Sequence, residues 1–370
     1  MKVRCDRNSL VESLTSIAGI IPPNSPKEIL GGFYLGTAAG SLVVEASDLE
    51  ISGTAVIHKV EVESDGAVAL PSSRLISILK ELPDEFVTVT SRDEPQGAVL
   101  ESGGFQFKIL GHDPGEFPKS EEPATTNSLS VAREKLHDAL KRVSVAASRD
   151  TTRYQLNGVF LEFQDGKLTL TATDGKRLTH DSFRVSETDV GAISAILPNQ
   201  AIDVFLKVLS GQGVQDETVT LSLSESHVTL KTKNHRVSSN LVEGMFPNYK
   251  AVMPAESAIR IKSKKAELLA AARSAALTAD KQTSTVIFKV SPSSLVLESN
   301  AQDVGESRIE ISVESTGDSM EVRFNPIYFI DALRTFDEDE ITMELSDPSR
   351  PAVLRTSQNY KHLVMPLVNT

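Results

Sequence analysis

The 370-residue sequence contains a single cysteine, Cys5, and no tryptophan. One cysteine excludes an intrachain disulfide framework and a cysteine-based zinc site, and it is typical of proteins in a reducing compartment. No stretch reaches the roughly 18 consecutive apolar residues that a membrane-spanning helix needs, and no apolar signal-peptide core follows the N-terminal charges. We therefore expect a cytoplasmic protein that is neither exported nor inserted into a membrane.

An excess of basic residues is also missing. The chain has 38 Lys and Arg against 50 Asp and Glu, which gives a net charge of −12. Phosphate binding usually shows as a basic balance, so this total argues against nucleic acid unless the charges are segregated on the surface. Hydrophobic residues make up 40% of the chain, which excludes disorder, and the length favours two or three domains.

Motifs of enzymes are absent from the sequence. The seven histidines show no HExxH or HxxxH spacing, and we find no G-x-S-x-G elbow, no GxxxxGK[ST] loop and no GxGxxG after a strand. A carboxylate pair for glycoside hydrolysis stays open, because 50 acidic residues allow some pair to meet in space. We expect a protein without catalytic residues, metal or cofactor.

What the sequence does contain is a threefold repeat. A short β-like stretch leads into a helical pattern near the start of each third, and a second helix follows a strand midway through each third. The equivalent positions are Val3, Val131 and Ile261, and then Pro71, Pro198 and Asn325. Alternating segments between them are typical of half-buried strands. The sequence predicts three similar α+β domains, over residues 1–125, 126–254 and 255–370, with helix pairs packed on antiparallel sheets.

The predicted helices have one apolar face each. Leu136, Leu140, Val143 and Ala147 recur at helical spacing and predict a buried stripe, which leaves Lys141, Arg142 and their neighbours toward solvent. Basic residues on such faces are also ordinary solvated groups, so their role stays open. Lys264 is different, because a cation at a helix N-terminus opposes the helix dipole and so hints at function.

The sequence resembles a known family, the bacterial sliding clamps, which are the β subunits of DNA polymerase III. The resemblance rests on segments that occur in order along the whole chain: TTRYQLNGVFLE (151–162), TATDGKRL (171–178), FPNY (246–249), FNPIYFIDAL (324–333) and HLVMPL (362–367). It implies three clamp domains per chain and a head-to-tail homodimer that closes a six-domain ring. An acidic rim with basic helices around the hole would reconcile the net charge with DNA binding.

The resemblance also implies function and partners. The ring would encircle duplex DNA without reading its sequence, and its topology would confer processivity on the polymerase. Short linear peptides of the DNA polymerase III α subunit, the clamp loader, other polymerases and repair proteins would dock in an apolar pocket. The alternative from a different class is a β-rich peptide-binding scaffold that does not encircle DNA.

Carried over residue by residue, the peptide pocket would comprise Leu156, Thr173, Gly175, Lys176, Arg177, Leu178, Pro247, Val252, Asn325, Tyr328, Leu363, Met365, Pro366 and Leu367. Met and Leu supply adaptable apolar walls. Taken singly, each of these residues also fits an ordinary core or turn. Ala251 stands where studied members carry an Arg, and near Gln282 an aromatic residue that is common in the family is missing.

Two further sets of residues follow from the resemblance. Contacts to DNA would come from Asn24, Arg74, Lys80, Lys141, Arg149, Arg153, Tyr154 and Lys264. For Arg153 an ordinary salt bridge at the start of a strand is the alternative. The dimer seam would place Phe107 and Ile109, on the edge strand GGFQFKILG, against Ala276 and Leu277 of the other chain. An ordinary core strand is the alternative there.

Overall fold

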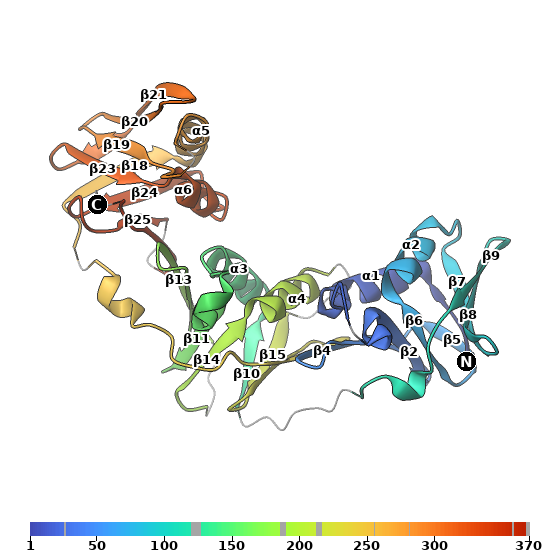
Figure 1. Ribbon diagram of the computed structural model, residues 1–370. Coiled ribbons are helices and arrows are strands. Elements are labelled where there is room, and N and C mark those ends of the chain that lie inside the picture. Colours follow the sequence, from blue (N-terminus) through green and yellow to red (C-terminus); the bar gives the residue numbers. More distant parts are fainter. Residues whose placement is uncertain are drawn as a thin grey trace. The chain divides into compact units, whose positions relative to one another are not determined.

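The computed structural model describes residues 1–25, 27–119, 127–185, 190–211, 217–254, 256–280, 282–356 and 359–367. The chain forms two compact units. The first comprises Met1–His137, Val185–Gly191 and Leu197–Leu241, and the second comprises Asp138–Arg184, Ala192–Ile196 and Val242–Thr370. Both units consist of antiparallel sheets with helices packed on them, which confirms the predicted α+β class (Figure 1).

The first unit contains two sheets. The five-stranded sheet has the order β5-β1-β7-β8-β9, with β1 (Lys2–Asp6), β5 (Val60–Ser64), β7 (Phe86–Asp93), β8 (Gln96–Ser102) and β9 (Phe105–Leu110). The eight-stranded sheet has the order β10-β15-β16-β17-β4-β3-β2-β6. Its strands are β2 (Gly32–Ala38), β3 (Ser41–Ser47), β4 (Ile51–Ile57), β6 (Ala67–Pro71), β10 (Asn127–Ala132), β15 (Thr218–Leu223), β16 (His227–Lys231) and β17 (His235–Asn240).

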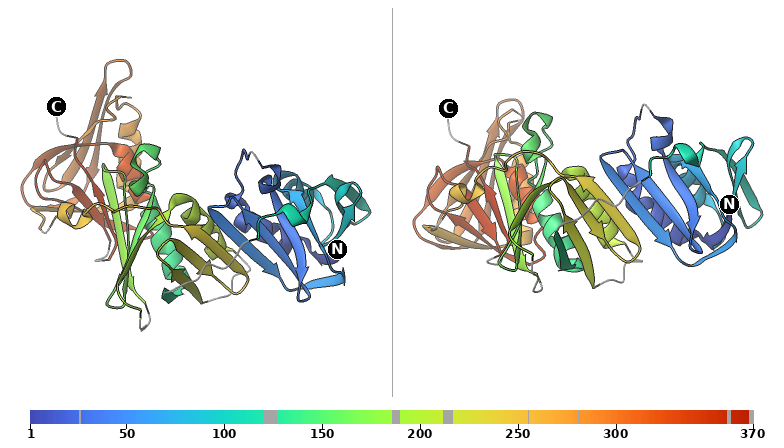
Figure 2. Two further views of the ribbon diagram at one scale, coloured as in Figure 1. Left: turned by 60° about the horizontal axis from the view of Figure 1, so that its bottom comes forward. Right: turned by 90° about the horizontal axis from the view of Figure 1, so that it is seen from below.

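Helices α1 (Arg7–Ile17), α2 (Ser72–Glu81) and α4 (Asn199–Ser210) pack on these sheets. Helix α1 begins where the Asp6 side chain accepts a hydrogen bond of 2.6 Å from the Ser9 backbone N–H, which satisfies one free amide of the first turn. It packs on β4 and contacts α2 and α4 (Figures 1 and 2). Short 3₁₀ turns are η1 (Ala18–Ile20), η2 (Glu28–Gly31) and η3 (Pro114–Glu116).

The second unit also contains two sheets. The nine-stranded sheet has the order β14-β11-β12-β13-β26-β25-β24-β18-β22, and the four-stranded sheet has the order β21-β20-β19-β23. The first is built from β11 (Gly158–Gln164), β12 (Lys167–Thr173), β13 (Arg177–Arg184), β14 (Ile193–Pro198), β18 (Ile259–Lys264), β22 (Glu314–Thr316), β24 (Glu340–Leu345), β25 (Ala352–Arg355) and β26 (Lys361–Val364). The second is built from β19 (Val286–Val290), β20 (Ser294–Ala301), β21 (Gly305–Ser312) and β23 (Met320–Phe324).

Helices α5 (Lys265–Ala276) and α6 (Pro326–Leu333) lie side by side on the sheets of the second unit. Phe288, Phe324 and Phe329 form the centre of their core, with ring centroids 4.7 to 5.3 Å apart. The remaining helix is α3 (Arg133–Ser144), and the remaining 3₁₀ turns are η4 (Thr151–Leu156) and η5 (Tyr249–Val252).

The predicted repeat is visible in the order of elements. The strand and helix at the start of each third are β1 and α1, β10 and α3, and β18 and α5, and the later pairs are β6 and α2, β14 and α4, and β23 and α6. The sheets nevertheless run across the thirds: β4 pairs with β17 in the first unit, and β13 pairs with β26 in the second. Pairing of this kind leaves fewer sheet edges exposed.

Helix α3 departs from the prediction at its end. Leu136, Leu140 and Val143 are buried as expected, but Ala146 is buried in place of Ala147. The reason is that the helix stops at Ser144 and the chain tightens into a turn, in which the Ala146 N–H donates to the Val143 carbonyl. Arg142 is also not left to solvent, because it pairs with Asp181 at 3.5 Å and with Asp337 at 3.0 Å.

Candidate binding pocket

The segment TATDGKRL forms a tight turn that is fixed by its own side chains. β12 ends at Thr173 and β13 begins at Arg177. The Asp174 carboxylate accepts hydrogen bonds from the Lys176 and Arg177 backbone N–H groups at 2.9 and 3.0 Å. Gly175 has a φ of +86°, which glycine adopts without steric cost. The turn is therefore rigid enough to hold Arg177 in one place.

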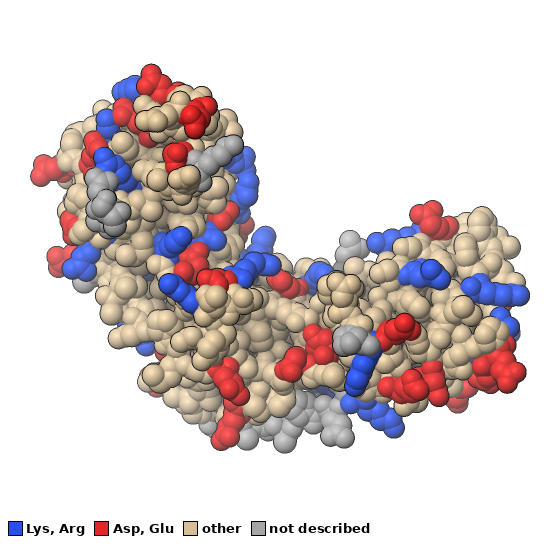
Figure 3. Space-filling model, in the orientation of Figure 1, with Lys and Arg blue, Asp and Glu red and all other residues tan. Residues whose placement is uncertain are grey.

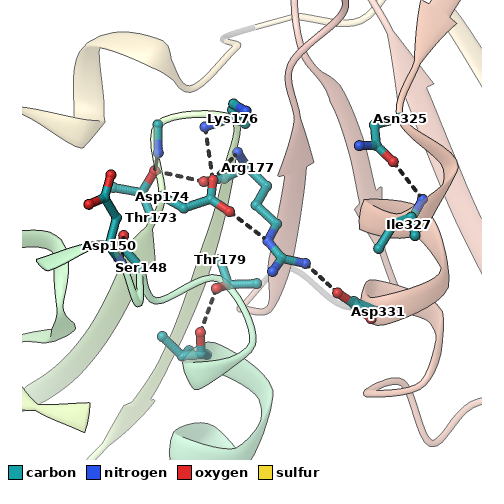
Figure 4. A network of polar contacts seen from close by, with 12 residues as sticks. Ser148, Asp150, Thr173, Asp174, Lys176, Arg177, Thr179, Asn325, Ile327 and Asp331 are labelled. Carbon is teal, nitrogen blue, oxygen red and sulfur yellow. Dashed lines mark hydrogen bonds and ion pairs between the residues drawn. The ribbon is translucent and has the colours of Figure 1, made fainter. Parts of the chain in front are cut away.

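Arg177 lies between two carboxylates. Its Nε is 3.0 Å from Asp174 Oδ2, and one terminal nitrogen is 2.7 Å from Asp331 Oδ2 on α6 (Figure 4). The guanidinium carbon is 4.8 Å from the centroid of the Tyr328 ring, and the Arg177 side chain is only 14% exposed. Charge-assisted hydrogen bonds of this length are among the stronger polar contacts in proteins.

A cavity of about 280 Å³ opens beside this arginine. It is lined by Arg153, Leu156, Thr173, Gly175, Arg177, Leu178, Pro247, Asn248, Tyr249, Val252, Leu363 and Met365. Three of these lining residues, Leu178, Tyr249 and Leu363, form a buried cluster with Val353. Phe160 and Phe246 pack against this cluster, and their rings stack with centroids 4.8 Å apart. A small apolar cavity with a few polar groups is suited to binding the side chains of a peptide.

Nine residues of the predicted pocket line this cavity: Leu156, Thr173, Gly175, Arg177, Leu178, Pro247, Val252, Leu363 and Met365. They come from segments more than 200 positions apart, so the fold brings them together. Their contact with a peptide stays a prediction.

Five predicted residues do not line the cavity. Lys176 is exposed in the turn, and Tyr328 stacks on Arg177. The Asn325 side chain accepts a hydrogen bond of 3.0 Å from the Ile327 N–H and so caps α6. Pro366 is buried, and the Leu367 N–H donates to the Arg323 carbonyl.

Three lining residues were missed by the prediction of the pocket. Asn248 and Tyr249 belong to the quoted FPNY segment, so their position in the motif was the available signal. The third residue, Arg153, is among the residues predicted to contact DNA. In the structure a Cβ at Gly175 would lie 3.1 Å from an Arg153 nitrogen, so the glycine leaves room for this arginine at the cavity.

Tyr249 is tied to the sheet below the cavity. Its hydroxyl donates to Glu162 Oε2 at 2.5 Å, and Lys250 lies 3.3 Å from the same carboxylate. Burial, and then the hydrogen bond to Glu162, raise the pKa of Tyr249. The phenol therefore stays protonated at neutral pH and keeps donating this hydrogen bond.

The residues predicted to bind DNA lie on several elements. Arg74 and Lys80 are exposed on α2, Lys141 is exposed on α3, and Asn24 and Arg149 are exposed between elements. Tyr154 is 55% exposed in η4. Lys264 precedes α5 and pairs with Glu267 at 3.2 Å, which offsets the unfavourable position of a cation at a helix N-terminus. On the face shown in Figure 3, basic and acidic side chains are interspersed.

The residues predicted for the dimer seam differ in exposure. β9 is an edge strand of its sheet, as the prediction requires. Ile109 is buried in the core and Phe107 is half-buried, while Phe105 and Leu110 are the exposed apolar side chains of this strand. At the end of α5, Ala276 is half-buried and Leu277 is 79% exposed.

Comparison with known proteins identifies the family. Residues 1–121, 130–248 and 250–368 match the N-terminal, central and C-terminal domains of the DNA polymerase III beta subunit. The chain belongs to the DNA polymerase III beta subunit family. This result confirms the resemblance and the three tandem clamp domains.

Relatives match the chain over its whole length. The "Beta sliding clamp" of Chlamydia pneumoniae is 28% identical over 367 residues, which is 99% of both chains, and that of Pseudomonas aeruginosa is 26% identical over 369 residues. Among solved structures, the DNA polymerase III beta subunit of Thermotoga maritima has a TM-score of 0.93 at 25% identity and full coverage of both chains. A Pseudomonas aeruginosa sliding clamp bound to griselimycin has a TM-score of 0.91 at 25% identity, again with full coverage.

Two further features are absent from the described parts of the chain. No described helix has the length and apolar character to cross a membrane. No group of three or more His, Cys, Asp or Glu side chains is arranged to hold a metal ion within the same residues.

Proposed function

We propose that this protein is a DNA sliding clamp, a non-catalytic accessory subunit of DNA polymerase III that encircles duplex DNA and confers processivity. The observation that carries the proposal is the match of all three beta subunit domains, in order, over nearly the whole chain. Two copies would associate head to tail into a closed ring. The protein would act in the cytoplasm, where the bacterial chromosome lies.

The cavity beside Arg177 would capture short linear peptides of the DNA polymerase III α subunit, the clamp loader, other polymerases and repair proteins. Its apolar lining and its location on the turn TATDGKRL support this proposal. A few buried apolar anchors can supply most of the binding energy of such a peptide. The five predicted residues outside the lining would then act at its margin or through their neighbours.

DNA would be held by the ring rather than by specific contacts. The exposed residues Asn24, Arg74, Lys80, Lys141, Arg149, Tyr154 and Lys264, together with Arg153, would meet the phosphate backbone. Contacts of this kind are independent of sequence and weaken with salt. We propose domain boundaries at 125/126 and 254/255, of which residues 120–126 and 255 lie outside the described residues.

The test of encirclement is retention on circular DNA. The clamp is loaded on a nicked plasmid by a bacterial clamp loader with ATP, and the protein that stays bound is measured after gel filtration in high salt. We expect retention on the circle and loss of the clamp once a restriction enzyme cuts it, because a linear molecule lets the ring slide off. Equal retention, or equal loss, on cut and uncut DNA would favour a scaffold that does not encircle DNA.

A further inference from the structure

The residues that line the cavity carry positive charge. Among the described residues, Arg153 and Arg177 are the arginines that line the cavity, and no described Asp or Glu lines it. On this count alone the cavity would attract an acidic side chain of a partner peptide. The neighbours of Arg177 change that expectation.

Arg177 is already neutralised from outside the cavity. Asp174 takes its Nε–H and Asp331 takes an N–H of one terminal nitrogen, and neither carboxylate lines the cavity. Figure 4 shows the two carboxylates reaching Arg177 from the turn and from α6. Arg177 and Arg334, which lies 3.9 Å from Asp331, balance the two carboxylates, so this cluster carries no net charge. An incoming carboxylate would therefore gain little from Arg177, although this arginine lines the cavity.

The two carboxylates have separable roles. Asp174 also accepts the backbone N–H groups of Lys176 and Arg177, so its replacement would disturb the turn. Asp331 is 31% exposed on α6, and its other basic neighbour is Arg334 at 3.9 Å. Asp331 can therefore be changed without removing a backbone contact.

We propose that Asp331 is a positioning residue that shifts the charge preference of the peptide pocket toward uncharged anchors: by pairing with Arg177 it offsets a cation that would otherwise favour an acidic anchor of the same shape. The inference rests on the proposed peptide-binding function. Arg177 then serves as a fixed wall of the pocket, stacked on Tyr328, rather than as a partner for a peptide carboxylate.

The experiment compares three synthetic peptides, acetyl-Gly-Leu-Ser-X-Phe-Gly-amide, in which X is Leu, Asn or Asp. In a second set X is Leu, and the first Leu is replaced by Asn or Asp instead. Their affinities for the full-length protein are measured by competition against a fluorescent peptide with Leu at X. Because Asn and Asp have the same shape, the ratio of their affinities reports charge alone.

In Asp331→Asn the cluster gains a net charge of +1, and we expect the ratio to shift toward the Asp peptide on the order of tenfold. Asp331→Glu keeps the charge and should keep the wild-type preference. Asp337→Asn is the matched control, because it removes an ion pair of 3.0 Å with Arg142 elsewhere in the same unit. It should leave the ratio unchanged.

A second variant keeps the inference testable if Asp331→Asn folds poorly. In an Arg177→Gln background the guanidinium is gone, so changing Asp331 should no longer favour the Asp peptide through Arg177. An unchanged Asn-to-Asp ratio in Asp331→Asn, with the Leu peptide still bound, overturns the inference. No binding of the Leu peptide to the wild type, or equal binding to Met365→Glu, would instead overturn the proposed peptide-binding function.

Discussion

Two histidines of the nine-stranded sheet have lowered pKa values, because burial disfavours their protonated form. His362 on β26 is fully buried, and neither ring nitrogen has a hydrogen-bond partner in the described chain. Burial, and then the charge of Arg177, lower the pKa of His362 to about 3. Burial, and then Lys167, lower the pKa of His180 on β13 to about 4. Both histidines should therefore be neutral in the folded protein at physiological pH.

The depressed pKa of His362 predicts a loss of stability in acid. Well above pH 6.5 the histidine is neutral in both states, and as pH falls through about 6.5 toward about 3 the unfolded chain binds the proton while the folded chain does not. Between pH 7.5 and 5.5, His362→Leu should reduce the loss in the free energy of unfolding by about 1.4 kcal/mol. Urea unfolding at the two pH values measures this difference. The exposed His58, replaced by Leu, is the control, and the prediction fails if both variants keep the wild-type pH dependence.

At the scale of elements, α6 depends on one side chain at its start. Asn325 accepts the Ile327 N–H at 3.0 Å, and Pro326 follows at the first helical position. Because α6 has only eight residues, the loss of its cap affects a large part of it. The helix also carries Tyr328 and Asp331, which hold Arg177 at the pocket.

Asn325→Ala should lower the free energy of unfolding by about 1 kcal/mol, while Asn325→Asp, which can still cap the helix, should lose much less. Urea denaturation of the three proteins measures the effect. The same variants also separate the cap from the predicted peptide contact. Loss of peptide affinity in Asn325→Asp at unchanged stability would point to a direct role in binding, and equal stability of all three proteins would contradict the role of the cap.

Local patterns predicted these elements where the determinants are close in sequence. The Asp-Gly turn of TATDGKRL and the stripe of α3 up to Val143 depend on neighbours within a few positions, so periodicity and turn chemistry were sufficient. Arg142 was predicted to face solvent because its partners, Asp181 and Asp337, are 39 and 195 positions away. The pocket needed the family resemblance for the same reason, since Met365 and Leu156 share no local pattern.

At the scale of the whole molecule, the edge strands of the smaller sheets are the features that favour association with another chain. β9 ends the five-stranded sheet of the first unit, and β21 ends the four-stranded sheet of the second. β9 exposes Phe105 and Leu110, which are 51% and 63% accessible. An exposed apolar edge favours association with another chain, and a closed dimer would remove the risk of open-ended aggregation.

Leu277 offers the cleanest test of that dimer, because a side chain that is 79% exposed contributes little to the fold of its own chain. Leu277→Glu places a charge at the predicted seam, so we expect monomers where the wild type forms dimers at micromolar concentration, with an unchanged thermal unfolding midpoint. Analytical ultracentrifugation measures the mass. Leu49→Glu is the matched control, since Leu49 is 58% exposed and is not among the residues predicted for the seam. The predicted seam would be contradicted if the wild-type protein is monomeric or if the Leu277→Glu variant stays fully dimeric. A monomeric Leu49→Glu variant would instead place the interface at the turn between β3 and β4.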